Sequence, residues 1–167
     1  SSSPIKIDAE NQVDPKKLLQ VYYDVQNDYK FSLLTHLLKS EKSGLVMVFC
    51  NTRTTTDFVA RNLKQSRIDS LAIHGGFSQD KRNRTLSSFH SSHVKVLVCT
   101  DIAARGLDIG GVSHIYNYDL PGDAKEYIHR IGRTARAGKE GKVINILTTR
   151  DYENFRKIME SFEMKIT

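Results

Sequence analysis

The stretch Val46-Met47-Val48-Phe49-Cys50 decides the fold class, because it is an unbroken run of apolar, mostly branched residues. A second run of the same character, Val94-Lys95-Val96-Leu97-Val98-Cys99, follows further along the chain. A strand with one face in water alternates polar and apolar residues, whereas a strand covered on both faces reads as nearly continuous apolar sequence. The two runs therefore predict buried strands in the middle of a sheet.

Weaker strand patterns and amphipathic segments alternate on either side of these runs. Further strands are expected at 21–25, 70–73, 112–118 and 143–147. Helical spacing of apolar residues links Phe31, Leu34, Leu37 and Leu38, and likewise Phe155, Ile158, Met159 and Phe162. A third helix carries Tyr127, Ile128 and Ile131, with Asp123 and Glu126 as candidate capping residues. This alternation predicts one α/β domain over 17–167 with parallel strands, preceded by a flexible tail or interdomain linker over 1–16.

The composition excludes several classes of protein. The chain has 167 residues, 39% hydrophobic and 26% charged, which suits one globular domain and not a disordered chain. No apolar run approaches the ~20 residues of a membrane span, and the N-terminus lacks the apolar stretch of a signal peptide. Cys50 and Cys99 lie in separate apolar runs, which predicts core thiols in a reducing, intracellular compartment, cytoplasmic or nuclear. The net charge of +6 suits a polyanionic partner.

Polar loops follow the expected strands, where a parallel sheet collects its binding groups. The loop after residue 73 contains Gly75 and Gly76, which allow backbone amides to approach an anion closely. Gln79 and Arg82 lie three residues apart, on one face of the expected helix, so both could contact the same phosphate. An ordinary loop before a capped, solvated helix explains the same residues.

The loop after Cys99 reads Thr100-Asp101-Ile102-Ala103-Ala104-Arg105-Gly106-Leu107-Asp108-Ile109. Asp101 or Asp108 could accept a hydrogen bond from a ribose hydroxyl, and Thr100 could donate one to a phosphate. In the alternative interpretation, Thr100 and Asp101 cap a short helix and Asp108 pairs with Arg105.

The segment 127–138 carries arginines at 130, 133 and 136 with no acidic residue among them. Guanidinium groups spaced in this way suit bidentate contacts with phosphate and with charge that develops during phosphoryl transfer. The alternative is a solvated basic face.

Several motifs are absent from the 167 residues. There is no G-x-x-x-x-G-K-[ST] loop, no acidic cluster suited to magnesium, and no H-E-x-x-H, C-x-x-C or G-x-S-x-G motif. His90 and His93 have a helical metal spacing but fit a polar surface loop better. The residues predict contacts with phosphates, no metal site, and no complete nucleotide site.

A fourth polar loop, Asn51-Thr52-Arg53-Thr54, follows Cys50. Taken together, the four segments in this order resemble the C-terminal RecA-like domain of DEAD-box ATP-dependent RNA helicases, over about residues 21–159. The residues 48–53 resemble motif IV, 74–82 motif IVa, 100–109 motif V and 129–136 motif VI. The chain departs from the family pattern at Ala135, usually Gly, and at Thr54, where many members carry a second basic residue.

The resemblance implies a RecA-like three-layer sandwich with a mostly parallel central sheet flanked by helices. It also implies that ATP and Mg²⁺ are bound mainly by an N-terminal RecA-like domain, which carries the phosphate-binding loop and the Asp-Glu-Ala-Asp motif. The chain alone is then expected to bind neither and to be inactive as an enzyme. As the C-terminal motor half, it would close with that domain over ATP and RNA and unwind short duplexes.

Site residues follow from the same resemblance. Arg133 and Arg136 would contact the γ-phosphate, with Arg136 as the arginine finger. Gly106 and Asp108 would lie at the nucleotide, and His129 would couple the site to the acidic motif of the N-terminal domain. The sugar-phosphate backbone of RNA would be held by Thr52, Arg53, Gly75, Gln79, Arg82, Thr100 and Asp101.

The expected partners are single-stranded RNA or an RNA duplex and the protein's own N-terminal RecA-like domain, with no membrane and a monomeric state. A different class of function is a non-catalytic RNA-binding or partner-docking domain of helicase-like fold. A pure binding domain has no use for Arg133 and Arg136 at these positions. A DNA-directed helicase of the same superfamily is disfavoured by the H-R-I-G-R-T pattern.

Overall fold

The computed structural model describes residues 13–91, 93–105, 107 and 109–161. Within these residues, all strand pairs are parallel, and the sheet has the order β1-β6-β5-β2-β4-β3. The six strands are β1 (Leu18–Asp24), β2 (Val46–Phe49), β3 (Ser70–Ile73), β4 (Val96–Cys99), β5 (His114–Asn117) and β6 (Gly141–Leu147). The predicted parallel α/β fold is confirmed.

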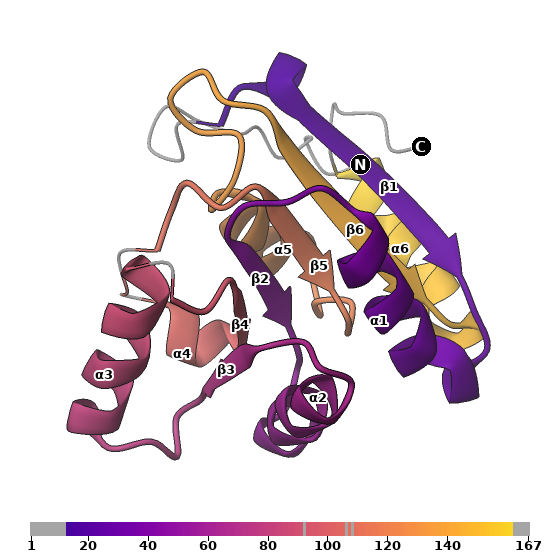
Figure 1. Cartoon of the computed structure of the whole chain (residues 1–167). Helices are drawn as coiled ribbons and strands as arrows, with labels where there is room; N and C mark the ends of the chain where they lie inside the picture. Colours follow the sequence, from indigo (N-terminus) through magenta and orange to yellow (C-terminus); the bar gives the residue numbers. More distant parts are fainter. Residues whose placement is uncertain (1–12, 92, 106, 108, 162–167) are drawn as a thin grey trace.

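Helices cover both faces of this sheet, which gives three layers (Figure 1). The helices are α1 (Lys30–Ser40), α2 (Arg53–Gln65), α3 (Gln79–His90), α4 (Asp101–Ala104), α5 (Ala124–Ile131) and α6 (Tyr152–Glu160). Short 3₁₀ turns occur at Pro15–Lys17, Asn27–Tyr29 and Thr149–Asp151. Helices α1 and α2 pack on one face, and α3 to α6 pack on the other. The expected three-layer sandwich with a parallel central sheet is confirmed.

The central strand β2 explains why its sequence is apolar throughout. Val46 and Val48 pack in the layer of α1 and α2, whereas Met47 and Phe49 pack in the layer of α3 to α6. All four side chains are buried, as the continuous apolar run predicts for a strand between two layers.

Strand β1 begins earlier than the apolar pattern indicates. It pairs with β6 from Leu18, opposite Gly141, to Asp24, opposite Leu147. The pattern starts at Val21 because the polar Gln20 interrupts it, yet Gln20 is buried and accepts a hydrogen bond from the Tyr127 hydroxyl at 2.8 Å. A hydrogen-bonded polar residue can occupy a core position that apolar periodicity does not reveal.

The segment predicted as a tail or linker is described from Val13 onward. Val13 is buried and forms an antiparallel bridge with Arg136, and the Asp14 amide donates to the Ala135 carbonyl at 3.2 Å. The domain boundary at residues 16 and 17 stays a prediction. Phe162 lies outside the described residues.

Cys50 directly follows β2 and Cys99 ends the neighbouring strand β4; both thiols are free and buried, as predicted for core thiols. Burial raises the pKa of the Cys99 thiol to about 12 and raises the pKa of Cys50 well above its ordinary value. Thiols that stay protonated are poor nucleophiles and metal ligands. Among the described helices, none has the length and apolar composition needed to cross a membrane.

Candidate functional site

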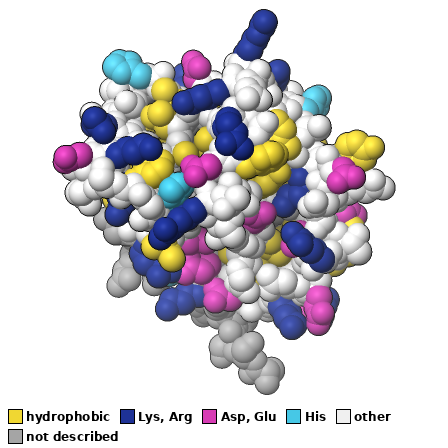
Figure 2. All heavy atoms as spheres, turned by 90° about the horizontal axis from the view of Figure 1, so that it is seen from below, with side chains coloured by type: hydrophobic (Ala, Val, Ile, Leu, Met, Phe, Trp, Pro, Cys, Tyr) yellow, Lys and Arg dark blue, Asp and Glu magenta, His cyan; other side chains and the backbone are white. Residues whose placement is uncertain are grey.

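The polar loops meet where the strands end. The strands point to the lower edge of Figure 1, and Figure 2 shows this edge, where Lys and Arg side chains lie among hydrophobic patches. Four helices begin here, each with a side-chain cap that accepts a backbone N–H three residues further on: Thr52 in α2, Ser78 in α3, Thr100 in α4 and Asp123 in α5. The capping predicted for Thr100 and Asp123 is confirmed, which orders the loops locally.

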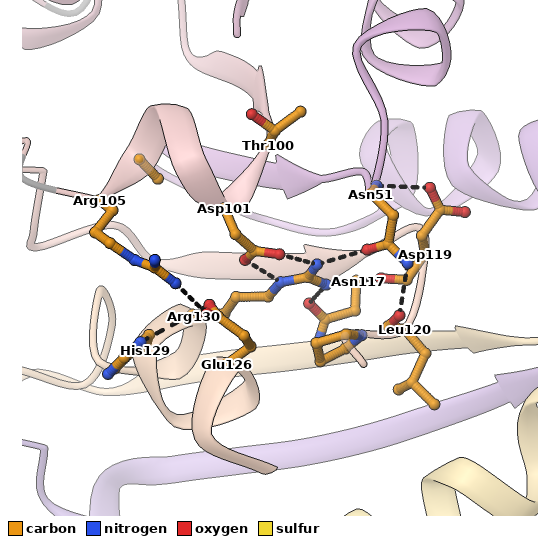
Figure 3. A network of polar contacts seen from close by, with 12 residues as sticks. Asn51, Thr100, Asp101, Arg105, Asn117, Asp119, Leu120, Glu126, His129 and Arg130 are labelled. Carbon is orange, nitrogen blue, oxygen red and sulfur yellow. Dashed lines mark hydrogen bonds and ion pairs between the residues drawn. The ribbon is translucent and has the colours of Figure 1, made fainter. Parts of the chain in front are cut away.

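Arg130 lies at the centre of the edge and is completely buried (Figure 3). Its five N–H donors are all used, which is the full capacity of a guanidinium group. They donate at 2.7–2.9 Å to both carboxylate oxygens of Asp101, to the side-chain oxygens of Asn51 and Asn117, and to the carbonyl of Asp119. One side chain of α5 thus joins the ends of β2, β4 and β5.

This network continues to both sides of Arg130. The Asp119 carboxylate accepts hydrogen bonds from the buried Lys30 ammonium at 3.1 Å and from the backbone N–H of Asn51 at 2.9 Å. In the other direction, Asn117 donates to Asn145, which donates in turn to the Tyr127 hydroxyl. Satisfied polar networks of this kind hold a unique arrangement in a core. Helix α5 is therefore fixed on the sheet through both Tyr127 and Arg130.

The buried role of Arg130 was not predicted from the sequence. A signal was present, because Arg130 lies three residues after Tyr127 and so shares the apolar face of the helix. A cation on a buried face requires a carboxylate or several carbonyl partners. Asp101, assigned to RNA by resemblance, supplies that carboxylate here, and its RNA contact stays a prediction.

Arg133 and Arg136 line a hollow of about 250 Å³ together with His129. Arg133 donates to the carbonyls of Ala104, Leu107 and Ile109 at 2.7–3.0 Å. The Arg136 guanidinium lies against Gly110, where a Cβ atom would be only 2.1 Å from Nη1. No hydrogen bond or ion pair joins that guanidinium to any residue that the structure describes. Among the described residues, the guanidinium of Arg133 is therefore held by hydrogen bonds, whereas that of Arg136 is held by packing against Gly110.

A second hollow of about 440 Å³ adjoins the first and is lined by Thr52, Arg53, Gly75 and Thr100. Both hollows share Asp101, Arg105 and Glu126. Arg105 forms an ion pair with Glu126, and His129 Nδ1 lies 3.8 Å from the other Glu126 oxygen (Figure 3). Glu126, a candidate capping residue by sequence, instead uses its carboxylate at the boundary between the two hollows.

Gln79 and Arg82 lie on the neighbouring helix α3 and line neither hollow. Gln79 donates to Asn83 at 3.0 Å, and Arg82 Nη2 donates to the Ala103 carbonyl at 3.3 Å. Arg82 Nε is buried and has no hydrogen-bond partner among the described residues. The last two carbonyls of α4 therefore each accept a hydrogen bond from an arginine. Arg82, a predicted RNA ligand, donates to Ala103, and Arg133, a predicted nucleotide ligand, donates to Ala104.

Two predicted nucleotide residues, Gly106 and Asp108, lie outside the described residues. Arg105, the partner that the alternative interpretation gave to Asp108, pairs with Glu126. The described ranges contain no group of three His, Cys, Asp or Glu side chains that could hold a metal ion.

Comparisons with known proteins agree with this geometry. Residues 29–138 match the family described as helicase conserved C-terminal domain. A putative ATP-dependent RNA helicase of Caenorhabditis elegans is 43% identical over 149 residues, which are 89% of this chain and 30% of that protein. The DEAD-box ATP-dependent RNA helicase CshA of Bacillus subtilis is 40% identical over 162 residues, 97% of this chain and 33% of that protein.

Among solved structures, the Escherichia coli DEAD-box protein SrmB, bound to regulator of ribonuclease activity A, is similar with a TM-score of 0.86. The identity is 38%, and the match covers 90% of this chain and 89% of that one. The chain therefore matches that solved chain almost throughout, whereas it spans about a third of the length of the two curated relatives.

Proposed function

This chain belongs to the helicase conserved C-terminal domain family, as the C-terminal RecA-like domain of a DEAD-box protein, and on that premise we propose that it serves as the C-terminal half of an ATP-dependent RNA helicase. The observation that carries the proposal is the pair of adjoining hollows. One is lined by Arg133 and Arg136, and the other by the hydroxyl groups of Thr52 and Thr100, the backbone of Gly75 and the guanidinium of Arg53. The first suits a triphosphate, and the second suits the backbone of a nucleic acid.

In the nucleotide hollow, Arg136 acts as the arginine finger. Among the described residues, no hydrogen bond or ion pair holds its guanidinium, and a guanidinium at this place can meet the charge that develops on a γ-phosphoryl group. Arg133 would exchange backbone carbonyls for phosphate oxygens. ATP with Mg²⁺ is held mainly by an N-terminal RecA-like half, with Gly106 and Asp108 contributing from this chain.

In the RNA hollow, Thr52, Arg53, Gly75, Thr100 and Asp101 hold the sugar-phosphate backbone, with Gln79 and Arg82 beside them on α3. Contacts to phosphate and sugar position a strand without reading its sequence. The expected ligand is therefore single-stranded RNA of any sequence, or the end of a short duplex.

The two hollows share Glu126 and its ion pair with Arg105. A ligand in one hollow can therefore shift side chains that also line the other. When the two halves of a monomeric helicase close over ATP, His129 couples this edge to the acidic motif of the N-terminal half. The RNA strand is bent as it is held, and a short duplex separates. Hydrolysis then reopens the halves.

The proposal is tested by measuring RNA-stimulated ATP hydrolysis for two polypeptides. The 167-residue chain alone should hydrolyse ATP no faster than background, because few of its groups reach the nucleotide. The complete helicase that contains this domain should turn over ATP and be stimulated by RNA more than by DNA of the same sequence. Magnesium-dependent turnover by the chain alone, or equal stimulation by DNA, would contradict the proposal.

A further inference from the structure

His74 directly follows strand β3 and is buried, with 9% of its side chain exposed. Its Nε2 atom lies 3.0 and 3.1 Å from the two carboxylate oxygens of Asp57. Its Nδ1 atom accepts the backbone N–H of Gly76 at 3.0 Å. An Nδ1 atom that accepts this bond carries no proton, so we assign the ring as the tautomer with its proton on Nε2, which donates to Asp57.

These hydrogen bonds join two segments that are far apart in the sequence. Asp57 lies on α2, one turn after Arg53, whereas Gly76 lies in the loop between β3 and α3. Phe77 packs on the imidazole with ring centroids 4.4 Å apart, and the Lys81 ammonium lies 3.9 Å from the Phe77 ring. The imidazole is thus fixed by two polar partners and one aromatic neighbour.

The same loop lies in close contact with Arg53. A Cβ atom at Gly75 would be 3.1 Å from Arg53 Nη2, and one at Gly76 would be 3.0 Å from His74 Cε1. The Arg53 guanidinium therefore rests on the backbone of Gly75, and both residues line the second hollow. The distance between the Arg53 guanidinium and the Gly75 backbone depends on how the loop between β3 and α3 is held against α2.

We propose that His74 is a positioning residue for the RNA-binding surface. Through Asp57 and the Gly76 amide, it holds the loop 74–78 against α2 and so sets the distance between the Arg53 guanidinium and the Gly75 backbone. These are the two groups that would meet one phosphate of the RNA strand. The inference rests on the proposed function, because it names a residue that arranges the RNA contacts without touching RNA.

Two substitutions separate the two hydrogen bonds of the ring. In His74→Asn the amide oxygen lies near the place of Nδ1 and can still accept the Gly76 N–H, but the side chain is too short to reach Asp57. In His74→Gln the amide nitrogen lies near the place of Nε2 and can still donate to Asp57. Asp57→Asn removes the charge and keeps an acceptor. His90→Asn, at the exposed end of α3, is the matched control.

Binding of a labelled oligouridine to the 167-residue chain is measured at low salt by fluorescence anisotropy, with unfolding by urea followed in parallel. We expect His74→Asn to weaken binding about tenfold, Asp57→Asn to weaken it less, and His90→Asn to leave it unchanged. The loss from His74→Asn should be non-additive with Arg53→Ala and additive with Arg82→Ala, because only Arg53 rests on the loop. A residue that merely stabilised the fold would couple equally to both arginines.

The ring nitrogens provide an independent readout by NMR. We expect the His74 signals of the wild-type chain to show a protonated Nε2 and an unprotonated Nδ1. A proton on Nδ1, equal coupling to the two arginines, or wild-type affinity in His74→Asn would overturn the inference while leaving the proposed function intact. If the wild-type chain bound no RNA, the proposed function and the inference would both be wrong.

Discussion

Arg130 donates from Nε and Nη2 to the two carboxylate oxygens of Asp101, at 2.7 Å each, and none of its side chain is exposed to solvent. This forked ion pair joins α5, which leads into the Arg133 and Arg136 segment, to the first residue of α4. The loop after β4 and the segment after α5 therefore share one buried connection, and their relative positions follow from it.

Substitution of Arg130 should destabilise the fold strongly. Lysine has a single ammonium and cannot reproduce the fork, so Arg130→Lys leaves buried acceptors without donors. We expect a loss of about 3–5 kcal/mol in the free energy of unfolding, measured by urea titration. Arg156→Lys, in an exposed pair with Glu160 at 2.7 Å, is the control and should change stability by about 0.5 kcal/mol or less. Similar losses in both variants would contradict the role given to Arg130.

Substitution of Arg136 should remove turnover in a complete helicase. A planar guanidinium can bridge two phosphate oxygens and a lysine ammonium cannot, so we expect both Arg136→Ala and Arg136→Lys to lower the RNA-stimulated kcat by about 10³- to 10⁵-fold. Binding of ATP to the N-terminal half should persist. Lys139→Ala, an exposed change nearby, should have no such effect. Near-normal turnover in Arg136→Lys would show that Arg133 is the better candidate.

Substitution of Arg82 should weaken RNA binding uniformly. The contact proposed for Arg82 is to phosphate, so Arg82→Ala should lower affinity by a similar factor for different RNA sequences and reduce the salt slope by roughly one unit. Arg84→Ala, on an exposed position of the same helix, is the control. Affinity is measured by fluorescence anisotropy across a salt series. A loss confined to one RNA sequence would show that Arg82 reads bases.

Ala135 occupies a backbone conformation that favours glycine, with a φ of 53°, and it is buried. Ala135 stands where the family pattern usually has Gly, and for a residue with a Cβ atom this backbone angle adds a strain of about 1 kcal/mol. In Ala135→Gly, relief of this strain should offset the lost methyl burial, leaving the free energy of unfolding within about 0.5 kcal/mol. Ala60→Gly, at a buried position inside α2, has no strain to relieve and should lose about 1 kcal/mol or more. Equal losses of unfolding free energy in Ala135→Gly and Ala60→Gly would contradict the backbone strain inferred at Ala135.

Glu41 lies at the opposite edge of the sheet and should make stability depend on pH. The hydrogen bond from Lys142, at 2.6 Å, and that with His114, at 3.2 Å, hold the pKa of its carboxyl below the ordinary 4.5. A lowered pKa in the folded state stabilises the fold above the ordinary value, and this contribution is lost as pH falls through the folded value.

Glu41→Gln should therefore lower the free energy of unfolding by about 1 kcal/mol at neutral pH and by much less near about pH 3. Glu153→Gln, in an exposed pair with Lys157 at 3.8 Å, should change little at either pH. A loss from Glu41→Gln that is independent of pH would contradict the ion pair as its cause.

Much of this protein follows from short-range patterns in the sequence. The apolar runs at Val46 and Val96 predict buried parallel strands, because only a strand covered on both faces has no need of polar residues. Parallel strands end at one edge, so the loops that follow residues 50, 73 and 99 had to lie together. The capping roles of Thr100 and Asp123 are equally local, since each spans three residues.

The tertiary structure alone decided what the three evenly spaced arginines do. Arg130, Arg133 and Arg136 have the same pattern in sequence, yet the first is buried with five partners, the second is held by backbone carbonyls, and the third rests on Gly110. The partners of Arg130 lie between 11 and 79 residues away in the chain. Whether a guanidinium is satisfied or left open to a ligand depends on which distant carbonyls and carboxylates the packed layers bring within hydrogen-bond distance, and no local spacing carries that information.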